Sequence, residues 1–161
     1  MNYLNDIEDE IKGLGFEIIE KDFERPWGGF LVIDERQSQE FTNRFFNGIH
    51  IKNLKISGKL SPKILIIKPN SKLSWQYHRR RAEIWKVIRG EVGAIKSKSN
   101  NQNEKKILNE GDFFRIYKRE RHRLIGLDNY SVIAEIWQHT NEKEPSNEKD
   151  IIRIEDDYGR K

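Results

Sequence analysis

Apolar residues recur at helical spacing near the amino terminus of the chain. The apolar positions of this segment are Leu4, Ile7, Ile11 and Leu14. A spacing of three or four residues places such side chains on one face of an α-helix, and acidic residues early in the segment suit a helix start. The sequence therefore predicts a short amphipathic helix over Asn5–Leu14, ended by Gly13 and Gly15.

Beyond this helix the pattern changes to short β-rich runs separated by turn residues. The predicted strands are Phe16–Ile19, Gly29–Asp34, Ile49–Leu54, Ile64–Lys68, Ile84–Ile88, Val92–Ser97, Phe113–Tyr117, Arg123–Leu127 and Ser131–Trp137. Many short strands at regular spacing favour an all-β sandwich or barrel. The segment Arg36–Asn47 is ambiguous between a helical turn and an excursion over the barrel mouth. The polar stretches Ser97–Lys106 and Thr140–Lys149 predict loops.

The length of 161 residues fits a single domain. We divide it into an N-terminal helical extension (1–22), a barrel (23–140) and a C-terminal tail (141–161). No run of about 18 apolar residues is present, so we expect no transmembrane helix. The amino terminus lacks the basic start and apolar stretch of a secretory signal, and cysteine is absent. We therefore expect a cytoplasmic protein without disulfides or thiolate metal ligands.

The net charge of +4 comes from 30 basic residues spread among 26 acidic ones. The densest basic clusters, Arg79–Arg81 and Lys118–Arg123, lie in no RNA-binding signature, so we expect neither a nucleic-acid partner nor a membrane partner. An exposed turn explains the triple arginine equally well. An anionic small substrate, such as a sugar phosphate, accounts for local positive charge at least as well as nucleic acid does.

Four potential metal ligands stand in two predicted hairpins. Gln76 and His78 are two residues apart, so on a strand their side chains point to the same face. Glu83 opens the next strand, and His122 follows much later in the chain. An amide oxygen, two imidazoles and a carboxylate suit a divalent metal such as Zn²⁺, Mn²⁺, Fe²⁺, Co²⁺ or Ni²⁺.

These residues also carry a family resemblance. The spacing Gln-x-His-x₄-Glu-x₆-Gly resembles the first cupin motif with Gln in place of its first His, and His122 stands where the second motif places its His. The stretch LSWQYHRRRAEIWKVIRGE is similar to the cupin domain of type II mannose-6-phosphate isomerases, which occurs alone or fused behind a GDP-mannose pyrophosphorylase domain. Supporting segments are Arg25-Pro26-Trp27-Gly28, His122-Arg123-Leu124 and the tail Asp150–Arg160.

The resemblance implies a cupin-type double-stranded β-helix, or jelly roll. It also implies a metal-dependent aldose–ketose isomerisation, from mannose 6-phosphate to fructose 6-phosphate. The implied metal ligands are Gln76, His78, Glu83 and His122, similar to the zinc ligands of type I phosphomannose isomerases, so Zn²⁺ is the first choice of metal. We expect a homodimer, because C₂ is the commonest closed symmetry.

The reaction also needs a proton-transfer base and an anchor for the phosphate. Glu135 and Lys68 are the candidate bases and His139 is a weaker one. Arg153 is grouped with the catalytic residues as a phosphate anchor. The predicted substrate-binding residues are Arg25, Trp27, Ser74, Asp157, Tyr158 and Arg160. Two alternatives stay open. Glu135 orients a metal ligand instead of acting as the base, and, independently, the tail is only a structural clasp across the barrel and does not bind substrate.

Several positions depart from the family pattern. Tyr117 and Arg119 stand where Pro and Gly are usual, Ile136-Trp137 replaces Val-Gln, and Arg79-Arg80 replaces histidines. The connection from Glu135 to Asp150 is also a few residues longer. These changes leave the metal ligands intact, but they leave the identity of the sugar substrate undecided.

The function therefore has two alternatives. One is isomerisation of another sugar phosphate, such as a heptose phosphate. The other is a non-catalytic cupin that binds a sugar or nucleotide-sugar, because such barrels host many functions. Guanylyltransferase activity is not expected, because no Gly-rich nucleotide loop precedes the barrel.

Overall fold

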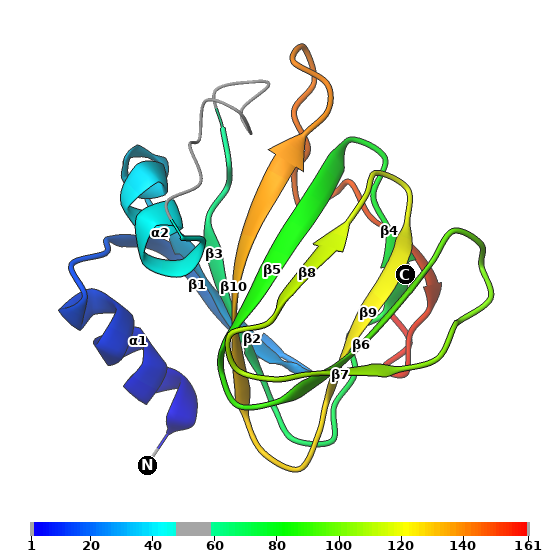
Figure 1. Ribbon diagram of the computed structural model, residues 1–161, viewed down its shortest axis with the longest axis horizontal. Helices are drawn as coiled ribbons and strands as arrows, with labels where there is room; N and C mark the ends of the chain where they lie inside the picture. Colours follow the sequence, from blue (N-terminus) through cyan, green and yellow to red (C-terminus); the bar gives the residue numbers. More distant parts are fainter. Residues whose placement is uncertain (1, 48–58, 161) are drawn as a thin grey trace.

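Two antiparallel β-sheets face each other, and two helices cover the outer side of one of them (Figure 1). The computed structural model describes residues 2–47 and 59–160. The predicted strand Ile49–Leu54 lies outside these residues. The all-β prediction is confirmed, with one short helix at the amino terminus. Within the described ranges, the helices are too short and too polar to cross a membrane.

Helix α1 (Tyr3–Gly13) forms where the helical spacing predicts it. The Asn2 side chain accepts a hydrogen bond from the Leu4 backbone N–H (2.9 Å) and so caps the first turn. Leu4, Ile7 and Ile11 are buried against the sheet. On the same helix Glu8 pairs with Lys21 of the first strand (2.9 Å), which fixes the helix to the sheet edge.

The ambiguous segment after the second strand forms a helix. A 3₁₀ turn (Glu35–Gln37) leads into α2 (Ser38–Phe45). Phe41 and Phe45 lie on its buried face, and both rings pack against Phe16. Only this pair of apolar residues marks the helical period, which is why the sequence pattern leaves the segment undecided.

The first sheet contains six strands and the second contains five. In spatial order the first sheet contains β1 (Ile18–Arg25), β2 (Gly28–Ile33), β3 (Lys63–Ile67), β10 (Ser131–His139), β5 (Arg81–Arg89) and β8 (Phe113–Ile116). The second contains β11 (Ile152–Glu155), β4 (Trp75–Tyr77), β9 (Arg121–Gly126), β6 (Val92–Ser97) and β7 (Lys106–Leu108).

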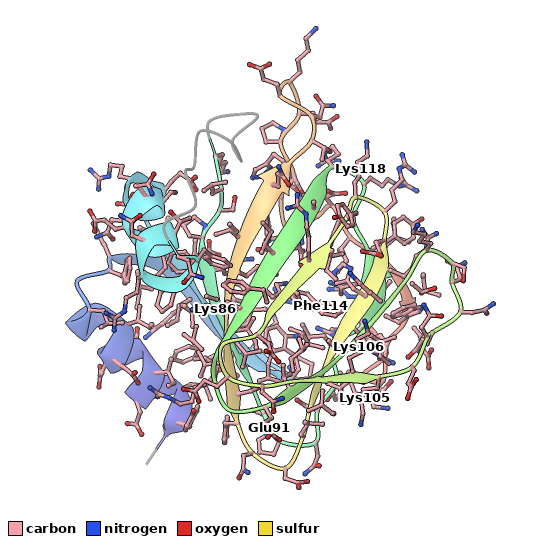
Figure 2. All side chains as sticks on the ribbon, in the orientation of Figure 1. Lys86, Glu91, Lys105, Lys106, Phe114 and Lys118 are labelled. Atoms are coloured by element: carbon pink, nitrogen blue, oxygen red, sulfur yellow. The ribbon has the colours of Figure 1, made fainter. Side chains whose placement is uncertain are left out.

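Alternating side chains of the first sheet supply two separate hydrophobic cores. On β3, Ile64 and Ile66 pack beneath the helices, whereas Leu65 and Ile67 face the barrel interior. Figure 2 shows the same division, with Phe114 between the sheets and Lys86 on the other face of the first sheet. Because successive side chains on a strand point to opposite faces, this parity decides which polar residues enter the barrel.

The carboxyl-terminal tail is part of the second sheet. Strand β11 pairs antiparallel with β4, with Ile152 opposite Tyr77 and Arg153 opposite Gln76. The tail therefore lies directly beside the strand that carries the predicted metal ligands. The described strands β4, β7 and β11 have three or four residues each, and the sequence pattern alone did not indicate β7 or β11 as strands.

Strand β10 ends at His139, which fixes the following loop to the barrel. The Ser146 backbone N–H donates to His139 Nδ1 (3.0 Å), and His139 Nε2 lies 3.1 Å from the Ser61 hydroxyl. Because Nδ1 accepts, the ring proton of the neutral imidazole is on Nε2. Burial, together with the charges of Lys59 and Arg81, lowers the pKa of His139 to about 4.

The turn between β1 and β2 requires glycine at position 28. Gly28 has a φ of +141°, and a Cβ there would lie 1.9 Å from the Ile66 carbonyl oxygen. We expect Gly28→Ala to lower the free energy of unfolding by about 3 kcal/mol, measured by urea denaturation. Gly13→Ala is the control, because nothing lies within 4 Å of that position; it should stabilise by up to about 1 kcal/mol. Equal midpoints for Gly28→Ala and the parent would contradict this account.

His139 should make the protein sensitive to acid. Its folded-state pKa lies below the unfolded value, so the unfolded chain binds the extra proton between pH 6.5 and 4. Stability is therefore full above pH 6.5 and falls as the pH drops toward 4, by on the order of 2 kcal/mol from this group. His139→Asn, whose Oδ1 stands at the position of Nδ1 and can still accept from Ser146, should flatten that slope in urea unfolding measured from pH 4 to 7. Parallel pH profiles for the two proteins would exclude this role for His139.

Candidate metal centre and substrate cavity

Three of the four predicted metal ligands converge inside the barrel. His78 follows β4, Glu83 lies on β5 and His122 lies on β9. His78 Nε2 is 3.0 Å from Glu83 Oε1 and 3.1 Å from His122 Nε2, and His122 Nε2 is 3.7 Å from Glu83 Oε2. All three side chains are buried. The pairing of Gln76 with His122 in the second sheet brings β4 and β9 together at this point.

The hydrogen bonds of the two imidazoles determine which ring nitrogens face the centre. His78 Nδ1 lies 2.7 Å from the Asp150 carbonyl oxygen, and His122 Nδ1 lies 3.0 Å from the Glu120 carbonyl oxygen. A carbonyl oxygen can only accept, so each Nδ1 donates its proton. In the neutral rings both Nε2 lone pairs then face each other and the Glu83 carboxylate. Such an electron-rich set of nitrogen and oxygen donors fits a divalent metal ion.

Gln76, the fourth predicted ligand, borders this centre. Its Nε2 lies 3.4 Å from His78 Nε2, and its Oε1 accepts a hydrogen bond from the Ser74 hydroxyl. Rotating the amide by 180° would exchange its oxygen and nitrogen. The oxygen would then face the centre, while the amide nitrogen could still bond to the Ser74 hydroxyl.

Arg81 reaches the same centre, which the sequence did not indicate. Its Nε donates to Glu83 Oε1 (2.9 Å), and its Nη2 lies 3.2 Å from His78 Nε2. The guanidinium also lies 3.6 Å from the ring centroid of Trp137. The exposed-turn interpretation of the triple arginine therefore fails for Arg81, which is buried. The signal that could have revealed this is its position two residues before Glu83, on the same face of β5.

Charge and burial set the protonation of the centre. Burial by itself would raise the pKa of Glu83, but interactions with His78, Arg81 and, more weakly, His122 outweigh it and hold that pKa well below its usual value. Burial lowers the pKa of His122 to about 4. At neutral pH the site therefore combines a carboxylate with a neutral imidazole, which are the forms that bind a metal.

A second carboxyl group, Glu135, lies beside the first. Trp85 Nε1 donates to Glu135 Oε1 (2.9 Å) and Trp137 Nε1 donates to Glu135 Oε2 (3.1 Å). Burial and the negative charge of Glu83 raise the pKa of Glu135 to about 8. Of these two neighbouring carboxyl groups, therefore, only Glu83 is charged at neutral pH.

A cavity of about 160 Å³ opens from the metal ligands toward the tail. Its basic side chains are Arg25, Lys63, Arg81, Arg123, Arg153 and Arg160, against the acidic Glu83, Glu135 and Glu148. Trp27, Phe30, Trp85 and Trp137 contribute aromatic surface. The cavity thus combines a cationic wall with apolar faces, which suits an anionic ligand that also has an uncharged ring.

Most of the predicted substrate residues lie at this cavity. Those that line it are Arg25, Trp27, Ser74 and Arg160, together with Glu135 and Arg153 from the predicted catalytic set. Asp157 and Tyr158 are not among its described lining residues. Asp157 lies 3.4 Å from Arg123 Nη2, and the Tyr158 hydroxyl accepts from the Lys72 N–H (3.3 Å). Asp157 thus contacts a lining residue, Arg123, from outside the cavity.

The lysine of the cavity is Lys63, not Lys68, which the sequence pattern had indicated as a candidate base. Lys63 shares the inward face of β3 with Leu65 and Ile67. Lys68 follows the end of that strand, and neither it nor His139 is among the described residues that line the cavity. The alternation of side chains along β3 was the signal that could have identified Lys63, because it places Lys63 on the same face as the apolar Leu65 and Ile67.

Comparison with solved structures identifies the fold. Vicilin from Corylus avellana (hazelnut) is similar with a TM-score of 0.58 and 17% identity, covering 88% of this chain and 36% of that chain. A mutant of oxalate decarboxylase from Bacillus subtilis is similar with a TM-score of 0.58 and 12% identity, covering 84% of this chain and 30% of that one. The match thus spans about a third of either protein. The barrel is a double-stranded β-helix of the cupin type.

A sugar phosphate isomerase of the cupin superfamily from Silicibacter pomeroyi also matches, at a TM-score of 0.43 and 13% identity over 49% of this chain and 50% of that one. This similarity is too distant to carry an argument about activity. A search of curated protein sequences finds no significant match.

The sequence itself matches a family described as "Mannose-6-phosphate isomerase C-terminal" over residues 17–156. The match includes all four predicted metal ligands, the strands that carry them and most of the tail. The chain therefore belongs to the mannose-6-phosphate isomerase C-terminal family.

Proposed function

We propose that this protein is a metal-dependent aldose–ketose isomerase that interconverts mannose 6-phosphate and fructose 6-phosphate. The observation that carries the proposal is the convergence of two imidazole Nε2 atoms and a carboxylate at the end of a cationic cavity. Membership of the mannose-6-phosphate isomerase C-terminal family supports the same reaction class.

The donor set fits a divalent ion, with Zn²⁺ as the proposed metal. His78, Glu83 and His122 would hold it, with Gln76 beside them. The ion supplies Lewis-acid charge that stabilises negative charge on substrate oxygens. Arg81 keeps the Glu83 carboxylate in place through Oε1, and the Asp150 and Glu120 carbonyls keep the two imidazoles in the ligating tautomer.

Proton transfer between C1 and C2 of the sugar needs a group that can both take and give a proton. Glu135 is the carboxyl group proposed for this step, because it lines the cavity beside Glu83. The indole N–H groups of Trp85 and Trp137 hold both of its oxygens, so its position is fixed before substrate enters.

The phosphate group needs fixed positive charge at the other end of the cavity. Arg153 and Arg160 line the tail side, and Arg25 lines the side of the β1–β2 turn. Arg160 is held by Asp156 (2.8 Å), which limits the side-chain entropy lost when it binds an anion. Trp27 at the same turn provides an apolar face for the sugar carbons.

Removing one imidazole tests the metal centre. We expect His78→Ala to reduce the bound metal, measured by elemental analysis, from about one ion per chain to near zero. Isomerase activity with mannose 6-phosphate should fall by more than about 100-fold, because weaker changes around ligands already cost 10–100-fold. Arg79→Ala, an exposed neighbouring change, is the control and should keep both metal and activity. Metal and turnover that both survive His78→Ala would exclude this ligand assignment.

Glu135→Gln tests the acid–base role separately. The amide keeps the shape of the side chain but cannot transfer a proton, so kcat should fall by about 10²–10⁴-fold while KM and metal content change little. Steady-state kinetics on protein of known metal content measure the effect. A loss of metal with kcat per bound ion unchanged would instead assign Glu135 to orienting a ligand. A protein that binds metal and sugar phosphate without any turnover would be a binding cupin.

A further inference from the structure

One carboxylate of the cavity belongs to neither the metal centre nor the proposed acid–base group. Glu148, from the loop between β10 and β11, forms an ion pair with the Lys63 ammonium. Figure 1 shows this loop rising from the end of β10 and returning to β11 beside β4. Burial would raise the pKa of Glu148, but the charges of Lys63, Arg81 and Arg25 outweigh it and lower that pKa.

The two partners of this ion pair differ in their access to water. The Lys63 side chain is 6% exposed, whereas the Glu148 side chain is 54% exposed. The ammonium also lies over two aromatic rings, 4.7 Å from the centroid of Phe30 and 4.5 Å from that of Trp137. Glu148 therefore reaches in from the solvent side to a cation that is fixed inside the cavity.

The backbone on both sides of Glu148 is held to the barrel. Ser146 donates to Asp150 Oδ2 (2.6 Å), and Arg81 Nη1 donates to the Ser146 hydroxyl (2.9 Å) and to the Asn147 carbonyl oxygen (3.1 Å). Asp150 in turn accepts from the Arg79 and Arg80 backbone N–H groups. Rotation of the Glu148 side chain can thus open the site to solvent without displacing the loop.

We propose that Lys63 and Arg25 form an anion subsite, and that Glu148 occupies it as a built-in competitor which the phosphate group of a substrate displaces. This inference rests on the proposed function and narrows it, because it assigns the phosphate group to the Arg25 side of the cavity, next to Lys63, rather than to Arg153 and Arg160 on the tail side. A phosphate dianion interacts more strongly with these cations than a single carboxylate does, and the half-exposed Glu148 returns to water at little cost.

The exchange has a consequence for ligand choice. A neutral sugar offers no charge to replace that of Glu148, and displacing the carboxylate would leave Lys63 buried and unpaired. The subsite therefore rejects unphosphorylated sugars and admits phosphorylated ones.

The test uses inorganic phosphate as the probe, with calorimetric titration of the full chain. Glu148→Gln removes the competing charge at a half-exposed position but takes the partner away from the buried Lys63, so thermal unfolding is measured first to show that the variant is folded. We expect this variant to bind phosphate about tenfold more tightly than the parent, because the exchange no longer requires breaking an ion pair. Glu144→Gln is the matched control: it removes a carboxylate from the same loop, 70% exposed and 4.0 Å from Arg80, and should leave phosphate affinity unchanged.

A second substitution identifies the cation. Lys63→Met in the Glu148→Gln background should abolish the gain in phosphate affinity, while thermal unfolding shows whether the double variant is folded. If the phosphate bound at the metal instead, its affinity would not change on Lys63→Met. Equal phosphate affinity of the parent and Glu148→Gln, or no measurable binding to either, would overturn the inference. Because phosphate binding needs no turnover, a positive result without isomerase activity would refute the proposed reaction and keep the anion subsite.

Discussion

The hydrogen bond from His78 Nδ1 to the Asp150 carbonyl oxygen connects the chemistry of this protein to its fold. It places the ring proton on Nδ1 and so leaves the Nε2 lone pair for the centre of the barrel. The side chain of Asp150 also accepts hydrogen bonds from the backbone N–H groups of Arg79 and Arg80. These bonds hold the tail against the segment that follows β4. Strand β11 then continues this contact by pairing with β4. A tail segment far along the chain is therefore needed to give a ligand its tautomer.

The interior also has to contain several charges without leaving any of them isolated. Glu83 is charged and accepts a hydrogen bond from Arg81. Glu135 stays protonated, because two carboxyl groups this close together do not both ionise at neutral pH. Lys63 is paired with Glu148 and covered by aromatic faces. Buried charges of this kind contribute little net stability, because desolvation offsets their attraction. Their arrangement is better understood as a requirement of the ligand than of the fold.

Sequence patterns predict the parts of this structure that depend on local periodicity. The amphipathic helix, the longer strands and the clustering of His78, Glu83 and His122 follow from spacing alone or from a motif of fixed spacing. Strands β7 and β11 are too short to show a period and form because a neighbouring strand offers hydrogen bonds. Arg81 and Lys63 were not selected from the sequence for a different reason. Arg81 belongs to an arginine run that an exposed turn explains equally well, and Lys63 stands just before the predicted strand Ile64–Lys68, whereas their positions on β5 and β3 place both side chains inside the barrel.

Aromatic residues are distributed unevenly with respect to the cavity. Trp27, Trp85 and Trp137 line it, and they are three of the four tryptophans in the sequence. The fourth, Trp75, is buried beside Gln76, and its indole nitrogen donates to the Asn100 carbonyl oxygen. Indole emission depends on the polarity and charge around the ring. Three of the four indoles that contribute to the native fluorescence therefore belong to the walls of the site, and their emission offers an optical signal of occupancy that requires no added label.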